Sequence, residues 1–289
     1  PVTIAAGKDT PLTVQLDRQI DTGGALSADL HLHANPSTDS PLSLRGRLTQ
    51  LAAVGVEYAV ATDHNAVTNY APVLKTTGLH RWVVSDVGVE ITTRRALYGH
   101  FNIWPLPAGS PVPRYRNTTP REMFAAWRKR SPKVVIQVNH PRMYSIGYFN
   151  QVDFDRARGR AFGPGWSADF DALEVFNGDF MYSPAKVEHN LKDWFLLLNL
   201  GHRFTATGNS DAHKLGYQEA GYPRTFIEVA PKSDTPASQR TAAGQAHPQL
   251  HRALVSQRPG HLRGGLARRR AAARRGGGLR ARPGEGVRV

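Results

Sequence analysis

The chain has 289 residues, of which 40% are hydrophobic, and a formal net charge of +14. This length is sufficient for one large hydrophobic core. The absence of cysteine excludes disulfides, thiolate metal sites and a cysteine nucleophile, so any metal must be bound by histidine and carboxylate groups. No stretch approaches the roughly 18 consecutive apolar residues that a membrane-spanning helix needs.

The positive charge lies mainly in the C-terminal part of the chain. Residues 240–289 contain twelve Arg, no Lys and one acidic residue, so they carry +11 and leave +3 for the first 239 residues. This part has few aromatic or β-branched residues and no helical or strand period, and residues 236–289 are therefore predicted to be a disordered, Arg- and Gly-rich tail. Two other interpretations stay open: a basic arm for nucleic acid or anionic surfaces, and an out-of-frame translation of GC-rich DNA.

The rest of the chain is predicted to contain a short N-terminal segment and one main domain. Residues 1–25 alternate weakly in hydropathy and predict the end of a β-domain or a linker, and residues 26–235 are assigned to the main domain. After a first strand at Leu30 and Leu32, strands are predicted at VEYAVAT from Val56, WVVSDVGVEIT from Trp82, HFNIWPL from His100, VVIQVNH from Val134, ALEVFNG from Ala172, FTATGNSDAH from Phe204 and RTFIEV from Arg224.

Helices are predicted between several of these strands. Leucines spaced by three and four residues mark a helix that begins at Leu44 and is ended by Gly55. The segment Thr119–Glu122 reads as a capping box with proline at the first helical position. The clearest helix runs from Pro184 to Leu200. Its predicted apolar face consists of Val187, Leu191, Trp194, Phe195 and Leu198.

This alternation of strands and helices predicts an α/β fold with a parallel sheet, either open or closed. Enzymes built on closed β/α barrels place their sites at the carboxyl ends of the strands. Polar residues lie at such ends throughout the main domain, which favours the closed form. They are His33, His64, Glu90, His140 and Asp211.

The chemistry of these strand ends points to a metal site. His31 and His33 are two residues apart on a strand, so both rings face the same side, and Asp29 is placed to orient one of them. Asp211 and His213 repeat this spacing with a carboxylate in place of one ring.

Two acidic residues strengthen this interpretation. Asp63 and Glu90 each end or follow an apolar strand, where a buried carboxylate is costly unless it is paired with a cation. A structural salt bridge is the alternative for either residue alone. Five polar clusters at five successive strand ends favour a shared metal site over unrelated salt bridges.

The motifs DLHLHAN, TDHN, GVEIT, GHFN, NHPR and NSDAH resemble, in this order, those of the PHP (polymerase and histidinol phosphatase) domain. Within that superfamily they look most like the CehA/McbA group of metallohydrolases. The resemblance spans about residues 26–230. It implies a distorted, TIM-like barrel of seven strands with a centre of two or three metal ions.

The resemblance also implies which residues bind each ion. A first ion would be bound by His31, His33, Glu90 and Asp211. A second would share Glu90 as a bridge and add His100 and His140. A third would be bound by His64, His213 and Asp39, the last standing where many members have histidine.

The function that follows is a metal-dependent hydrolase. Two cations that share a bridging water lower its pKa, so that hydroxide attacks a phosphoester or a carboxylic ester, carbamate or amide. Glu90, Asp63 and Arg142 are the candidate catalytic residues, Asp63 as a support for His64 or for the water. Arg142, with Arg94 and Arg95, is a candidate partner for an anionic substrate group. Ligands with only N and O donors suit zinc, manganese or iron.

The expected partner is a small-molecule substrate rather than nucleic acid. A non-catalytic, metal-stabilised or nucleic-acid-binding module is the alternative, and the basic tail is its only support. The sequence suggests a soluble protein of bacterial type, with export to the periplasm or the outside as an option. It leaves the substrate, the oligomeric state and the metal open.

Overall fold

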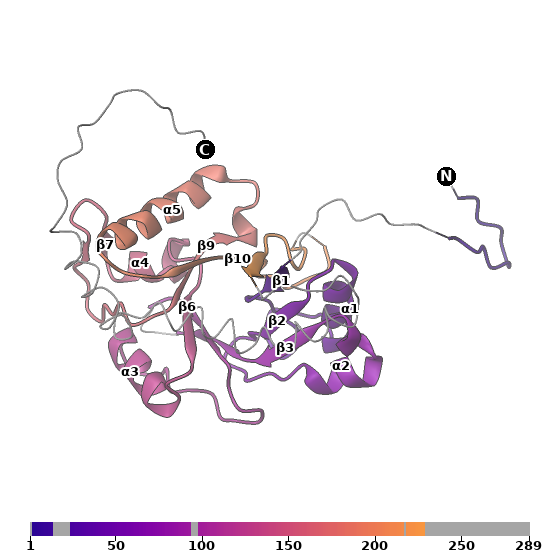
Figure 1. The fold of residues 1–289 in the computed structure, drawn as a ribbon, viewed down its shortest axis with the longest axis horizontal. Helices are drawn as coiled ribbons and strands as arrows, with labels where there is room; N and C mark the ends of the chain where they lie inside the picture. Colours follow the sequence, from indigo (N-terminus) through magenta and orange to yellow (C-terminus); the bar gives the residue numbers. More distant parts are fainter. Residues whose placement is uncertain (1, 14–23, 94–97, 217, 229–289) are drawn as a thin grey trace, which may run out of the picture.

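The computed structural model describes residues 2–13, 24–93, 98–216 and 218–228 (Figure 1). The predicted tail, residues 236–289, and the two candidate anion-binding residues Arg94 and Arg95 lie outside the described residues. Residues 2–13 contain a turn and no strand. In the described part, no helix combines the length and the apolar character needed to cross a membrane.

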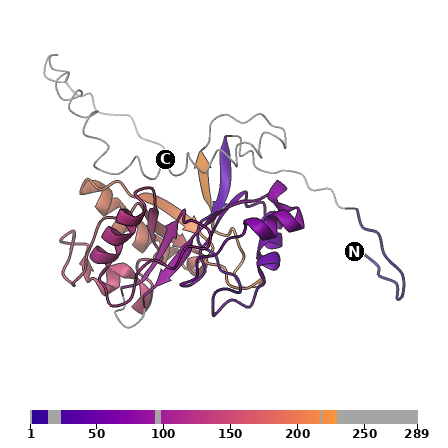
Figure 2. The same ribbon diagram turned by 90° about the horizontal axis from the view of Figure 1, so that it is seen from below.

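Most strands belong to two sheets. The first has the order β11-β1-β2-β3, and its strands are β11 (Thr225–Glu228), β1 (Ala25–Asp29), β2 (Tyr58–Ala61) and β3 (Val84–Val87). The second has the order β10-β9-β6-β5-β4, and its strands are β10 (Thr205–Asn209), β9 (Ala172–Asn177), β6 (Val135–Val138), β5 (His100–Trp104) and β4 (Val89–Thr92). In Figure 2, β1 and β11 stand side by side at one edge of the molecule.

Helices cover the outer sides of these sheets. Figure 1 shows α1 and α2 beside β2 and β3, and α3 and α5 beside β6 and β9. The helices are α1 (Leu44–Ala53), α2 (Ala71–Thr77), α3 (Pro120–Arg130), α4 (Tyr148–Gln151) and α5 (Pro184–Asn199). The short elements are η1 (Leu79–Arg81), η2 (Tyr144–Ile146), η3 (Gly178–Phe180), β7 (Phe154–Asp155) and β8 (Arg160–Ala161).

The mixed α/β class is confirmed, but the predicted parallel sheet is only partly right. Neighbouring strands are parallel from β1 to β3 and from β6 through β9 to β10. The pairs β1–β11, β4–β5 and β5–β6 are antiparallel. No helix lies between β4 and β5 in the part of the chain that the structure describes, and antiparallel neighbours need no helical crossover.

The closed barrel is not present as one continuous sheet in the described residues. The two sheets meet between β3 and β4, which follow one another around Gly88. A Cβ there would lie 2.7 Å from Val60 Cγ1 and 2.9 Å from the Ala61 oxygen, so only glycine fits this crossing. At the opposite edges, the sheets are connected past the ends of β1 and β10 by a single bridge between Leu32 and Ala212.

The helix signals of the sequence are largely confirmed. Thr119 and Glu122 form the predicted capping box of α3, and Gly55 adopts the left-handed conformation (φ 71°) just after α1. Packing of α3 and α4 on β5 buries an aromatic core that includes Phe101, Phe124 and Tyr148.

The predicted apolar face of α5 needs correction. The residues of this helix that are fully buried are Asn190, Asp193 and Leu197, whereas Phe195 is 53% exposed. Leu191 and Trp194 of the predicted face do pack against the core, whereas Asp193 is buried with its carboxylate bound to Arg142, from the segment after β6, and to Arg156, which follows β7. A polar interaction therefore sets part of its buried face.

Candidate metal centre

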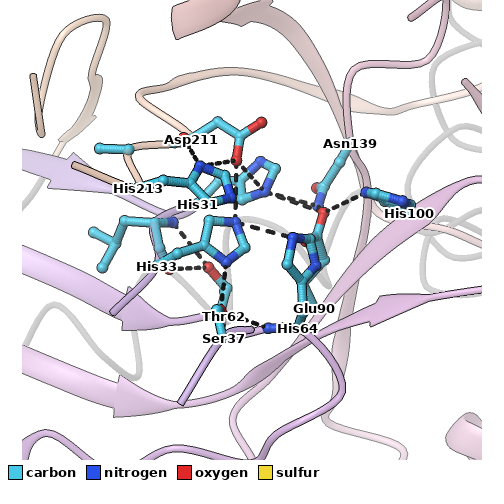
Figure 3. A network of polar contacts seen from close by, with 12 residues as sticks. His31, His33, Ser37, Thr62, His64, Glu90, His100, Asn139, Asp211 and His213 are labelled. Carbon is cyan, nitrogen blue, oxygen red and sulfur yellow. Dashed lines mark hydrogen bonds and ion pairs between the residues drawn. The ribbon is translucent and has the colours of Figure 1, made fainter. Parts of the chain in front are cut away.

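Glu90 lies at the middle of a cluster of imidazoles (Figure 3). It is fully buried on β4, and its Oε1 lies 3.1 Å from His31 Nε2 and 3.2 Å from His100 Nδ1. Its Oε2 lies 2.6 Å from His64 Nδ1, and His140 Nε2 is 3.8 Å from Oε1. One carboxylate thus faces rings from four separate parts of the chain.

Asp211 joins the two histidines of the first motif. Its Oδ1 lies 3.1 Å from His31 Nε2 and 3.0 Å from His33 Nε2. The second oxygen accepts a hydrogen bond from Asn177 Nδ2 at 3.0 Å. Because His31 and His33 have no exposed surface, this side of the cluster is closed to solvent.

The opposite side of the cluster is more open. His64 and His213 have side chains that are 12% and 15% exposed, and both rings approach Asp39, which is 52% exposed. Asp39 Oδ2 lies 3.2 Å from His64 Nε2 and 3.6 Å from His213 Nε2. The segment around Asp39 therefore places a carboxylate at the rim of the cluster.

These residues form overlapping sets that can each hold an ion. In each set, three ligand atoms lie within 4.8 Å of one another. The sets found among the described residues are His31–His33–Asp211, His31–Glu90–His140, His64–Glu90–His100 and His33–His64–His213. We call the eight residues in these sets, together with Asp39, the histidine cluster. All nine candidate metal ligands from the sequence are thus brought together, and Glu90 belongs to two sets, as expected for a bridge.

The backbone is constrained where two of these side chains leave it. His140 and Asp211 have positive φ values of 27° and 52°, which are uncommon for residues other than glycine. Arg47, a fully buried arginine of α1, donates to the carbonyl oxygens of His33 (2.8 Å) and Ala212 (2.7 Å). It ties together the segments that bear His33, Asp211 and His213.

Sequence reasoning missed Glu174, a buried residue of β9. Its Oε1 lies 2.9 Å from His31 Nδ1, and its Oε2 accepts a hydrogen bond from the His140 backbone N–H at 2.8 Å. It therefore orients a ring and a ligand-bearing loop from behind the cluster. The available signal was the one used for Glu90: an acidic residue inside an apolar strand.

Two acidic residues of the first motifs occupy supporting positions. Asp63 accepts hydrogen bonds from the Ala34 N–H (2.7 Å) and from Ser37 Oγ (3.0 Å), and Ser37 Oγ in turn lies 3.0 Å from His33 Nδ1. Asp63 therefore supports the loop after β1. Asp29 does not orient a ring as expected, because Ser210 and the Gly221 N–H occupy its carboxylate.

Arg142 is directed away from the cluster. Its guanidinium forms two contacts with Asp193, at 2.7 and 3.2 Å, and donates to the Phe154 oxygen at 2.9 Å. Arg142 is therefore not the free partner for a substrate anion at the cluster that the sequence had suggested. Asn139 and Asn209, in contrast, reach the cluster region and donate to Glu90 (2.7 Å) and Glu174 (2.9 Å).

The carboxylates and imidazoles shift each other's pKa values in opposite directions. Burial would raise the pKa of Glu90, but His64, His100 and His31 hold it well below its usual range. Burial would lower the pKa of His64, but the Glu90 charge raises it to about 9. Burial raises the pKa of Asp211 to about 6, although His31 counteracts this shift. Glu90 is therefore an anion that requires positive charge around it.

Other histidines of the cluster are kept neutral. Burial, followed by the neighbouring His100, lowers the pKa of His140 to about 3, and burial also lowers the pKa of His33 well below its usual value. His31 differs: burial opposes protonation, but Asp211, Glu174 and Glu90 raise its pKa well above the usual value. Neutral imidazoles are the form that binds metal ions.

The donor set fits divalent metal ions. Only imidazole nitrogens and carboxylate oxygens face the centre. The buried Nδ1 of His140 has no hydrogen-bond partner within the described part of the chain. The anionic Glu90 carboxylate requires positive charge around it, and Zn, Mn or Fe ions accept this combination of ligands.

Comparison with solved structures shows what the fold resembles. A two-domain protein from Bacteroides vulgatus that contains a predicted PHP-like metal-dependent phosphoesterase is 19% identical (TM-score 0.50; 83% of this chain, 67% of that chain). Endonuclease Q, in complex with a 27-mer duplex bearing an abasic lesion, is 16% identical (TM-score 0.48; 76% of this chain, 57% of that chain). A putative metal-dependent phosphoesterase from Bifidobacterium adolescentis is 15% identical (TM-score 0.41; 75% of this chain, 96% of that chain).

These similarities extend to the fold and no further. No model of a protein family matches the chain, and no curated protein matches it either. The likeness to the Bacteroides protein supports a shared mixed α/β fold. What the chain does must be argued from its own side chains.

Proposed function

We propose that residues 26–235 form a metal-dependent hydrolase domain of the PHP superfamily. The observation that carries this proposal is the position of Glu90. Its two oxygens lie 2.6–3.8 Å from nitrogens of five histidines, and no arginine or lysine of the described residues forms an ion pair with it. A buried carboxylate surrounded in this way by imidazoles is suited to bridge metal ions.

The proposed reaction is hydrolysis of a phosphoester or of a carboxylic ester, carbamate or amide. Two or three ions of Zn, Mn or Fe, when bound, would supply an activated water and polarise the bond to be cleaved. The ordered set of motifs favours the CehA/McbA branch. We further propose that the two sheets form one distorted barrel, which the bridges Leu32–Ala212 and His64–Glu90 support.

The residues of the chain have distinct tasks in this scheme. His31, His33 and Glu90 are fully buried and exclude bulk water from one side of the centre. His213 Nδ1 donates to the backbone carbonyl oxygen of Asp211 at 2.8 Å, so Nε2 is the ring nitrogen on the side of Asp39. His64, His213 and Asp39 form the exposed rim, where a substrate can approach and a proton can be exchanged.

Metal analysis and a substrate panel on the same sample test the proposal. Mass spectrometry should find two or three Zn, Mn or Fe ions per chain. Nitrophenyl phosphates, carboxylic esters and carbamates then identify the bond that is cleaved, and chelation should abolish turnover. A sample with metal that cleaves no member of the panel would favour a non-catalytic, metal-stabilised module.

A further inference from the structure

A cavity of about 310 Å³ is lined by residues none of which is a candidate metal ligand. One wall is the loop after β6, with Arg142, Met143 and Tyr144, and the other comes from η3 and the first half of α5. Met143 donates its N–H to the His140 oxygen at 2.9 Å, and η3 directly follows Asn177, whose side chain contacts Asp211. Both walls therefore begin beside proposed metal ligands.

The cavity has an excess of positive charge. Arg142 and Arg156 share the single carboxylate of Asp193, so one of these two charges is uncompensated. Lys186 adds another: its Nζ lies 2.9 Å from Tyr144 Oη and forms no ion pair with a carboxylate of the described residues. Partial burial, followed by Arg156, lowers the pKa of His189 at the same wall, which agrees with a positive local potential.

The lining also contains a hydrogen-bond acceptor that no described residue uses. Asn190 is fully buried, and its Nδ2 donates to the Val175 oxygen at 3.2 Å. Its Oδ1 has no hydrogen-bond partner among the described residues. A buried acceptor without a hydrogen-bond partner is unfavourable. A ligand with an N–H or O–H group would remove this cost.

The remaining walls are apolar or aromatic. Lys186 Nζ lies 4.9 Å from the ring centroid of Tyr144 and 5.3 Å from that of Phe180, and Met143 adds a flexible apolar side chain. The volume is at the lower end of the range for ligand pockets, roughly 300–1,000 Å³. The cavity therefore suits one ring-sized group rather than a polymer.

We propose that this cavity binds a small organic anion that has a ring-sized apolar body and an N–H or O–H donor. Lys186 would pair with the anionic group, Asn190 Oδ1 would accept from the donor, and Tyr144 and Phe180 would contact the ring. The proposal builds on the proposed hydrolase function, because such an anion is the part of the substrate that is held beside the metal centre.

Isothermal titration calorimetry with 4-hydroxybenzoate tests binding directly. 4-Hydroxyacetophenone, which lacks the charge, should bind about tenfold more weakly, since charge-assisted contacts are the stronger ones. Benzoate, which lacks the donor, should bind roughly fivefold more weakly. Equal affinities for all three compounds would overturn the proposal.

Variants of α5 locate the site. Lys186→Gln should weaken 4-hydroxybenzoate binding about tenfold, Lys186→Arg should largely restore it, and Ala185→Tyr, at an exposed helical position, should fill the cavity and abolish binding. Lys192→Gln is the matched control, because Lys192 pairs with Glu188 on the surface of the same helix. Unchanged binding in Lys186→Gln or Ala185→Tyr would refute the assignment.

The Glu90→Gln variant separates this proposal from the proposed function. If 4-hydroxybenzoate binds in the cavity, its affinity should stay within about twofold when metal is lost, because no residue that lines the cavity belongs to the histidine cluster. Binding that disappears together with the metal would place the anion at the histidine cluster and overturn the cavity. If the wild-type protein binds 4-hydroxybenzoate but hydrolyses no ester or phosphate, the proposed hydrolase function is wrong and the proposed anion-binding cavity is retained.

Discussion

Glu90 and Asp193 are both carboxylates without exposed surface, and the regions around them compensate their charges differently. Asp193 is paired with two guanidiniums, Arg142 and Arg156, which keep their charge at any ordinary pH. Among the described residues, the ionisable groups that contact Glu90 are imidazoles, and these can lose their protons. The first arrangement fixes α5 in place, whereas the second can exchange protons for metal ions.

The type of partner therefore determines what each buried carboxylate can do. A permanently charged partner makes the pair structural, because neither group can be released without a large cost. Imidazole partners leave the site open to another cation. Replacing either carboxylate with its amide and measuring both metal content and stability tests this difference between Glu90 and Asp193.

The largest effect is expected for Glu90→Gln. An amide cannot supply the negative charge or bridge two ions, so bound metal should fall and turnover should drop at least ~100-fold, the scale of losing one preorganised electrostatic contact. Mass spectrometry and the substrate panel measure both quantities. Exposed His80, mutated to alanine, is the control and should change turnover less than about twofold. Full activity with full metal occupancy in Glu90→Gln would exclude the bridging role.

Asp193→Asn should lower stability and leave metal content unchanged, the reverse of what is expected for Glu90→Gln. Removing the charge leaves two partly buried guanidiniums unpaired, and the free energy of unfolding should fall by about 2 kcal/mol, less than for a fully buried pair because solvent screens Arg156. Urea denaturation in the presence of a chelator measures this loss. Metal content per folded chain should stay the same, and a parallel loss of metal would show that the two regions are not independent.

The sequence predicted the histidine cluster better than the region around Asp193. Ligands such as His64 and Glu90 end or follow apolar strands, and strand ends converge whatever the details of packing. Asp193 lies in a helix, and its pairing with Arg142, 51 residues earlier, depends on how α5 docks. Hydrophobic periodicity alone cannot reveal such a contact.

The same limit of sequence patterns explains where the predicted fold and site differ from the structure. Alternation of strands and helices predicted parallel pairing, but the pattern does not specify which edges reverse, as β4, β5 and β6 do. Glu174 was overlooked although it is an acidic residue inside an apolar strand, because nothing in the sequence tells which face of β9 meets His31. Both features depend on contacts between distant segments.

Metal affinity should depend on pH in a way that Glu90 and its partners dictate. The pKa of His64 is raised to about 9, so below pH 9 the metal-free protein holds a proton that a metal must displace. Apparent affinity should therefore decrease as pH falls, by about tenfold per unit for each displaced proton. Competition titrations at pH 8 and pH 7 measure this slope.

Two variants identify the proton. His64→Gln should reduce the slope by about one proton per ion, because it removes the group that is protonated in the metal-free state. His140→Gln should weaken binding without changing the slope, since the pKa of His140 is lowered to about 3 and the ring is already neutral. A slope that is equally changed in both variants would contradict this assignment of charge.

The smallest effect is expected from deletion of residues 236–289. Among the described residues, the groups that form ion pairs with Glu90 and Asp193 lie between His31 and Arg156 in the chain. We therefore expect that the net charge of +11 in residues 240–289 is not needed at either site. Metal content and turnover should stay within about twofold of the full chain. Binding to duplex DNA at several salt concentrations provides the second measurement, because a basic arm would give a steep salt dependence that disappears on deletion. A large loss of turnover, or such a salt-dependent loss of DNA binding, would make the C-terminal part of the chain a functional element and revive the nucleic-acid interpretation.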